Sequence, residues 1–195
     1  NPRISIITVC ASINVKAEEN KTKDFINKDI LMEYCCQKCM GIYENVQGHH
    51  CEVIKRKKSK KIGGFYNQKT LLIPISQNKK KNFKIFWNGK VQMTGLKSTD
   101  EGYEVIQKFI EIVSNIDKTR KQQKLPTIIK NYDHLQLNNF KICLINSDFS
   151  VKFKIKRNIL YELLKQKYRI SVSYEPDYYQ GVKTKFYWNL FNKKQ

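Results

Sequence analysis

The segment from Phe83 to Gly95 constrains the fold most, because two runs of alternating apolar and polar residues flank an Asn-Gly pair. This pattern predicts a β-hairpin. A two-residue type I′ turn would pair Trp87 with Lys90, whereas a loop with one extra residue and a glycine bulge shifts the pairing by one. Because such a slip exchanges the two faces of a strand, the register that sorts the side chains better is favoured.

The odd-length loop gives the cleaner sorting of this hairpin. One face then carries four apolar side chains, and the other is mixed with one aromatic ring: Phe83, Ile85, Val91 and Met93 against Lys84, Phe86, Gln92 and Thr94. We therefore predict the odd-length loop, with an apolar core face and a mixed outer face.

The charge composition indicates a polyanionic partner. Among 195 residues, Lys and Arg number 37 and Asp and Glu 17, which gives a formal net charge of +20. Such an excess is typical of nucleic-acid-binding proteins, although a lysine-rich proteome would also produce it. No apolar run is long enough for a membrane span and no secretory signal is visible, so we expect an intracellular protein with no membrane partner.

The middle of the chain predicts one strongly amphipathic helix. Ser98 to Glu101 form a capping box, and the apolar spacing that follows predicts a helix to about Ile116. The polar residues 118–133, which include a proline, are predicted to be a linker.

The N-terminal pattern recurs after this linker. Residues 140–153 repeat the apolar rhythm of residues 3–15, and a helix and strands follow in both places. The second copy stops before any counterpart of the hairpin and its helix. We therefore predict two repeats, residues 1–133 and 134–195, with an insertion at residues 35–64 of the first.

Four of the six cysteines lie close to two histidines in that insertion. A C-x-x-C knuckle followed by histidine and cysteine offers ligands for a tetrahedral Zn²⁺ ion. The predicted ligands are Cys36, Cys39, His50 and Cys51, with His49 as the alternative histidine and Cys35 as a rival thiol. Free thiols in a loop are the alternative, and Cys-His nucleophilic chemistry is a more remote one. No other cofactor and no small-molecule substrate are expected.

Two motifs resemble the TATA-binding protein family. Ile85 to Ser98, IFWNGKVQMTGLKS, is similar to the family segment Ile-Phe-x-x-Gly-Lys-x-x-x-Thr-Gly-x-Lys-Ser. Tyr174 to Gly181, YEPDYYQG, is similar to the family segment Tyr-Glu-Pro-Glu-x-Phe-Pro-Gly, and Val151 to Phe153 match between them. The lysine- and asparagine-rich composition and the Cys/His insertion most resemble the divergent homologues of large nucleocytoplasmic DNA viruses.

The resemblance implies an α+β fold, a saddle in which one curved antiparallel sheet of two pseudo-repeats carries helices on its convex face. It covers nearly the whole chain except residues 35–61. The second repeat would lack its last hairpin and long helix, which we interpret as truncation of the chain.

The resemblance also implies a general transcription initiation factor, not an enzyme. The TATA-binding protein family binds duplex DNA in the minor groove and kinks it with aromatic wedges, and this family is itself the standard example of such kinking. The implied partners are double-stranded DNA and initiation factors or RNA polymerase, in a host nucleus or a cytoplasmic viral factory. The alternative is a protein-interaction platform that recruits the transcription machinery through the convex face or the Cys/His insertion.

The aromatic wedges are assigned by this resemblance. Phe86 matches the family's hairpin aromatic, and Tyr179 stands where the second repeat has phenylalanine. Phe65 is the expected partner of Phe86, with Tyr66 as the alternative. The competing explanations are ordinary sheet packing for Phe86, a turn aromatic for Tyr179, and a core role at the strand edge for Phe65 or Tyr66.

The expected polar contacts lie on the same predicted faces. Thr94 matches a groove-facing threonine, while Lys84 and Gln92 replace apolar family positions and could reach base edges or phosphates. Lys183 and Lys185 share the strand parity of Tyr179 and are expected to contact phosphates.

The family's two base-reading asparagines are not retained. Their positions hold Ile4 and Leu144, and Asn146, two residues further on, is the expected substitute in the second repeat.

Overall fold

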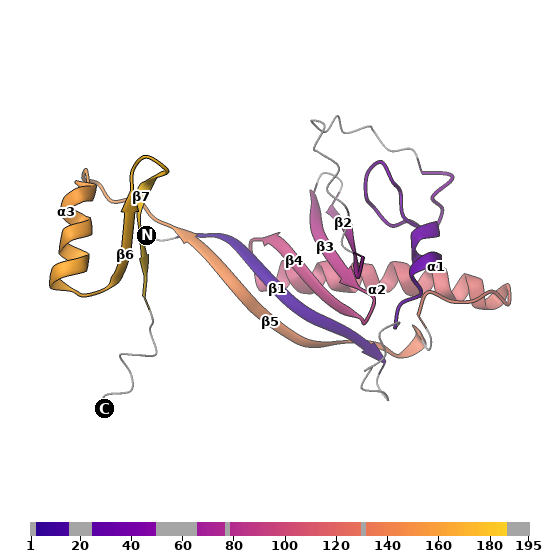
Figure 1. Cartoon of the computed structure of the whole chain (residues 1–195). Helices are drawn as coiled ribbons and strands as arrows, with labels where there is room; N and C mark the ends of the chain where they lie inside the picture. The colour runs from indigo at the N-terminus through magenta and orange to yellow at the C-terminus, as the bar shows by residue number, and fades with distance from the viewer. Residues whose placement is uncertain (1–2, 16–24, 50–65, 77–78, 130–131, 187–195) are drawn as a thin grey trace, which may run out of the picture. The chain divides into compact units, whose positions relative to one another are not determined.

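The computed structural model describes residues 3–15, 25–49, 66–76, 79–129 and 132–186 (Figure 1). The chain divides into two compact units, Asn1–Phe149 and Ser150–Gln195. None of the described helices is long and apolar enough to cross a membrane.

The first unit is a five-stranded antiparallel sheet with helices against one face, and its long strands are visibly curved in Figure 1. The strand order is β2-β3-β4-β1-β5. In chain order the elements are β1 (Arg3–Val15), α1 (Lys28–Glu33), β2 (Gln68–Ser76), β3 (Lys79–Phe86), β4 (Lys90–Leu96), α2 (Thr99–Gln122), a 3₁₀ turn (Tyr132–His134) and β5 (Leu135–Asp148).

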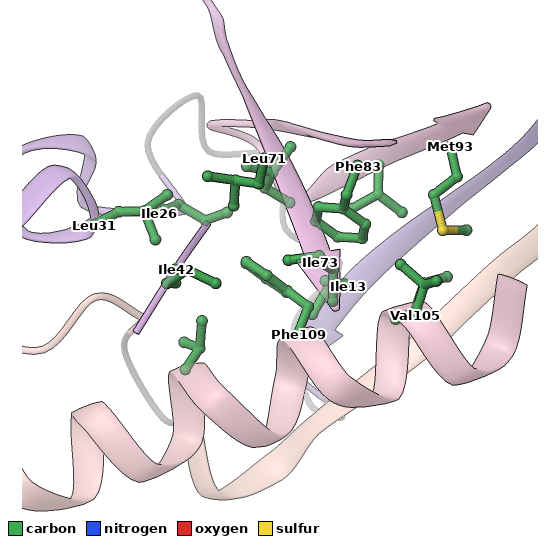
Figure 2. Packing of buried hydrophobic residues seen from close by; sticks show 14 of the residues in the cluster. Ile13, Ile26, Leu31, Ile42, Leu71, Ile73, Phe83, Met93, Val105 and Phe109 are labelled. Atoms are coloured by element: carbon green, nitrogen blue, oxygen red, sulfur yellow. The ribbon is translucent and has the colours of Figure 1, made fainter. Parts of the chain in front are cut away.

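The hydrophobic core lies between this sheet and the two helices (Figure 2). Alternate residues of β1 from Ile7 to Ile13 point into it, as do Leu31 of α1 and Phe109 of α2. Phe83 of β3 stacks on Phe109, with ring centroids 4.7 Å apart. We call the opposite side of the sheet, which α1 and α2 leave uncovered, the open face; it carries the even-numbered residues 82–86 of β3 and 92–94 of β4.

The hairpin has the odd-length loop that the sequence predicts. Phe83 pairs with Met93 and Ile85 with Val91, and all four side chains are buried. The loop closes with a 2.9 Å hydrogen bond from the Gly89 N–H to the Phe86 carbonyl. Gly89 has φ +79°, and a Cβ there would lie 2.5 Å from the Ile13 carbonyl oxygen, so both backbone conformation and space require glycine.

Helix α2 is longer than predicted, since it ends at Gln122 rather than near Ile116. Polar side chains near the C-terminal end of α2 hold the chain that follows. Both carboxylate oxygens of Asp117 accept backbone hydrogen bonds, from Ile128 at 2.6 Å and Ile129 at 2.9 Å. Arg120 donates to the Pro126 carbonyl at 2.6 Å. Tertiary contacts, which local spacing cannot reveal, therefore extend the helix.

Strand β3 also begins earlier than the predicted hairpin segment, at Lys79 rather than Phe83. Lys81 is buried there, with its Nζ 2.8 Å from the Gly95 carbonyl oxygen and 2.8 Å from Glu101 Oε2. Because its charge is compensated on the helix side of the sheet, a lysine can occupy a core position of the strand.

Strand β5 runs from Leu135 to Asp148, earlier than the predicted residues 140–153, because it pairs along nearly the whole of β1. Ile7 lies opposite Ile145, the residue that the repeat pattern aligns with it. The same alignment matches Ile6 with Leu144 and Thr8 with Asn146. In the sheet, Ile6 instead pairs with Asn146 and Thr8 with Leu144, so the alignment exchanges these two flanking pairs. This is the arrangement that two-fold related repeats would have at their axis, although the repeat boundary at residue 133 stays a prediction.

The second unit contains α3 (Arg157–Glu162), its π-helical continuation η2 (Leu163–Lys167), β6 (Ser171–Glu175) and β7 (Tyr179–Lys185). The two strands form an antiparallel hairpin, and Arg157 of α3 donates to the Gln180 side chain at 3.0 Å. None of its described residues is fully buried.

Candidate nucleic-acid interface

A polar row crosses the open face of the first unit. One residue from each strand contributes to it, each paired with the next: Thr70, Lys84, Gln92, Cys10 and Lys141. Lys141 is exposed and the others are half-buried. Lys84 and Gln92, predicted to face DNA, therefore lie side by side on the β3–β4 hairpin part of this face.

The predicted aromatic wedge lies beside this row. Phe86 is half-buried at the end of β3 and lines a hollow of about 530 Å³ together with Gln92, Lys90 and Lys141. An aromatic ring and two lysines thus border one concavity of the open face. Such a combination suits a polyanion with flat rings, because the cations meet phosphates while the ring stacks on or between bases.

The expected aromatic partner of Phe86 is not among its described neighbours. The residue opposite Phe86 on β2 is Gln68, and Phe65 lies outside the described residues. Tyr66 is 87% exposed, and its carbonyl accepts a 2.9 Å hydrogen bond from Trp87 Nε1.

Thr94 lies on the open face next to an amide that lacks a partner. It pairs with Asn82 of β3, whose buried Oδ1 has no hydrogen-bond donor among the described residues. The sequence did not single out Asn82; its strand parity with Lys84 and Phe86 is the signal that would have found it.

The centre of the open face, beside the Ile7–Ile145 pair, carries two exposed apolar side chains. Ile6 is 39% exposed and Leu144 50% exposed. Asn146, opposite Ile6, is exposed and is the amide of this central group. Asn146 therefore lies beside apolar side chains at the centre, and its role as the substitute for a base-reading asparagine stays a prediction.

The lysines on the two sides of the sheet differ in whether they form ion pairs. Lys79 and Lys81 both pair with Glu101, at the start of α2. Burial alone would raise the pKa of the Glu101 carboxyl, but hydrogen bonds from Lys79, Lys81 and the Lys97 N–H lower that pKa to about 2. Lys84, Lys90 and Lys141 make no ion pair within the described part of the chain. Their charge remains available to a ligand.

The candidate residues of the second unit share one face of its hairpin. Tyr179, Lys183 and Lys185 lie on the side opposite Gln180, which contacts α3. Tyr179 is 54% exposed, and Lys183 Nζ lies 4.7 Å from the centre of its ring. The predicted parity is therefore present, with a cation–π contact over the ring.

The Cys/His segment gathers three candidate metal ligands. The ligand atoms of Cys36, Cys39 and His49 all lie within 4.8 Å of one another. Two thiols and an imidazole suit zinc, which favours tetrahedral sulfur and nitrogen ligands. The structure thus contains the predicted cysteine pair and the alternative histidine, while His50 and Cys51 lie outside the described residues.

The local backbone explains this grouping. The Met40 N–H donates to the Cys36 carbonyl at 2.9 Å, which turns the chain back on itself. Tyr43 stacks on His49, with ring centroids 3.6 Å apart, and fixes the imidazole beside Cys39. Cys35 points elsewhere: its thiol donates to the Leu31 carbonyl at 3.2 Å, and burial raises its pKa to about 11.

Part of the chain is similar in sequence to TATA-binding proteins. The family model described as "Transcription factor TFIID (or TATA-binding protein, TBP)" matches residues 56–116. The "TATA-box-binding protein-like" protein of Acanthamoeba polyphaga mimivirus is 36% identical over 117 residues, which are 58% of this chain and 32% of that protein. The chain thus spans about a third of the length of this curated relative.

The fold is similar to that of Methanococcus jannaschii TBP, with a TM-score of 0.51 and 17% identity, over 93% of this chain and 74% of that one. This match confirms the α+β fold predicted from the two motifs.

Proposed function

We propose that this chain, which is TATA-binding-protein-like in sequence and fold and resembles a viral relative, is a DNA-binding transcription initiation factor. The observation that carries the proposal is the open face, where Phe86 and Lys90 lie beside a polar row that includes Lys84 and Lys141. None of these three lysines makes an ion pair within the described residues. Double-stranded DNA is the partner that such a face fits, and initiation factors or RNA polymerase would act on the assembled complex.

The finer mechanism that we propose is minor-groove binding with a kink at Phe86. The curved sheet would follow the groove, the apolar centre around Ile6 and Leu144 would contact the groove floor, and Lys84, Lys90 and Lys141 would approach phosphates. Phe86 would enter a base step from the end of β3. Exposed apolar groups in the middle of a cationic surface favour this arrangement over phosphate binding alone.

Titration of an A·T-rich duplex at several salt concentrations tests the proposal. Each neutralised phosphate releases counterions, so the binding constant should fall steeply between about 50 and 200 mM salt. A single-stranded oligonucleotide of the same sequence is the control and should bind more weakly. Duplex binding that does not respond to salt would contradict the proposal.

The second candidate is a protein-interaction platform with the same fold. Two observations favour it: apolar side chains stand at both positions where the family has base-reading asparagines, and Lys183 occupies the face of the Tyr179 ring. Equal and weak affinity for duplex and single strands in the same titration would support the platform.

We also propose that Cys36, Cys39 and His49 hold a Zn²⁺ ion, with Cys51 as the fourth ligand. The knuckle meets the edge of the sheet, because the Leu72 N–H donates to the Met40 carbonyl at 2.8 Å. A bound ion would therefore stabilise the outer strand β2 as well as the insertion.

Metal analysis of the purified protein tests this site. We expect about one zinc per chain, lost in Cys39→Ser and retained in the matched control Cys143→Ser, whose cysteine is exposed on β5. Equal zinc content in the two variants would contradict the site.

A further inference from the structure

The polar row of the open face has a consequence for base recognition. Gln92 is central in it, between Lys84 on one side and Cys10 on the other. Its amide makes no hydrogen bond with the described residues, so both its oxygen and its nitrogen are available. The resemblance described above implies that Lys84 and Gln92 replace apolar family positions on this face.

A second amide lies diagonally from Gln92. Asn82 pairs with Thr94, one row further along the hairpin, and diagonal neighbours on one face of a sheet are within reach of long side chains. The Oδ1 atom of Asn82 has no donor among the described residues. Because that oxygen is buried, Gln92 Oε1 is the amide oxygen of this pair that a ligand on the open face can reach.

The minor groove offers few features that such acceptors could recognise. A·T and T·A pairs present only acceptors there, whereas a G·C pair adds the exocyclic amino group of guanine, which is a donor. An apolar protein face leaves that donor buried without a partner and so rejects G·C pairs. An amide oxygen satisfies it, while the amide nitrogen still donates to A·T pairs.

We infer that this face tolerates G·C base pairs where it carries Gln92, because Gln92 Oε1 accepts from the guanine amino group. The inference rests on the proposed DNA-binding function. An apolar face would restrict this chain to sites made of A·T pairs. With Gln92, the chain can also bind sites that contain G·C pairs.

Three duplexes of one length test the inference at one salt concentration: A·T-rich, G·C-rich, and the G·C sequence with inosine for guanine, which removes only the minor-groove amino group. The wild-type chain should bind the guanine and inosine duplexes within about threefold of each other. Gln92→Leu should weaken guanine binding about tenfold relative to inosine binding, since the amino group loses its acceptor.

Lys84→Met is the matched control from the adjacent position of the same row. It removes a charge but no acceptor, so it should weaken binding to all three duplexes by the same factor.

A wild-type chain that binds the A·T duplex but prefers inosine to guanine tenfold would overturn the inference alone, as would an unchanged guanine-to-inosine ratio in Gln92→Leu. Failure to bind any of the three duplexes would overturn the proposed function together with it.

Discussion

The two faces of the β3–β4 hairpin are made by alternate residues of the same strands and yet have opposite properties. Phe83, Ile85, Val91 and Met93 are buried against the helices, whereas their neighbours in the sequence are half-buried on the open face. The buried residues of the hairpin therefore determine stability, and the alternating residues on the open face determine what the surface can bind. Substitutions one residue apart should separate the two.

The largest difference is expected between two phenylalanines of β3. Phe83 is fully buried and stacks on Phe109, so Phe83→Ala should lower the free energy of unfolding by about 3–5 kcal/mol. Phe86 is half-buried, so Phe86→Ala should cost about 1 kcal/mol. Urea denaturation of both variants measures the difference. Equal destabilisation would show that the two faces are not distinct.

The paired lysines should make stability depend on pH. The pKa of Glu101 is about 2 in the folded chain, below its ordinary value of 4.5. A lowered carboxyl pKa contributes stability that is fully present above the unfolded pKa and is lost as the pH falls from about 4.5 towards 2. Unfolding free energies between pH 6 and pH 2 should show wild type about 2 kcal/mol more stable than Glu101→Gln at the upper end, and converging with it at the lower end.

Glu104→Gln is the control for this titration, because Glu104 is exposed one helical turn further along α2. Its difference from wild type should stay small at every pH. A Glu101→Gln difference that stays constant down to pH 2 would contradict the assigned ion pairs.

A smaller effect should distinguish the lysines of the two sides in DNA binding. Lys84→Met should reduce the slope of log K against log salt by about one, as expected for one lost phosphate contact. Lys79→Met should leave that slope unchanged, since Lys79 already pairs with Glu101. The reverse result would indicate that DNA binds to the helix side of the sheet.

Local patterns predicted much of this structure. Alternation fixed the hairpin register, and the capping box located the start of α2, where Ser98 Oγ accepts from the Glu101 N–H at 3.2 Å. The two family motifs predicted the fold class, which the structural comparison confirms.

Long-range contacts account for what could not be predicted. The C-terminal end of α2 depends on Asp117 and Arg120 holding residues 126–129. The row that joins Gln92 to Lys141 depends on the pairing of β1 with both β4 and β5, including its bulges. The position of His49 beside the cysteine pair depends on its stacking with Tyr43. No periodicity in the sequence encodes these contacts.

The central claim is that the open face binds and kinks DNA, and the most direct measurement is fluorescence energy transfer between the ends of a labelled A·T-rich duplex. Wild type should shorten the end-to-end distance. Phe86→Ala should bind without shortening it, while Tyr103→Ala, which removes an aromatic ring from α2 on the opposite side of the sheet, should bend the duplex as wild type does. Unchanged bending by Phe86→Ala would contradict the account.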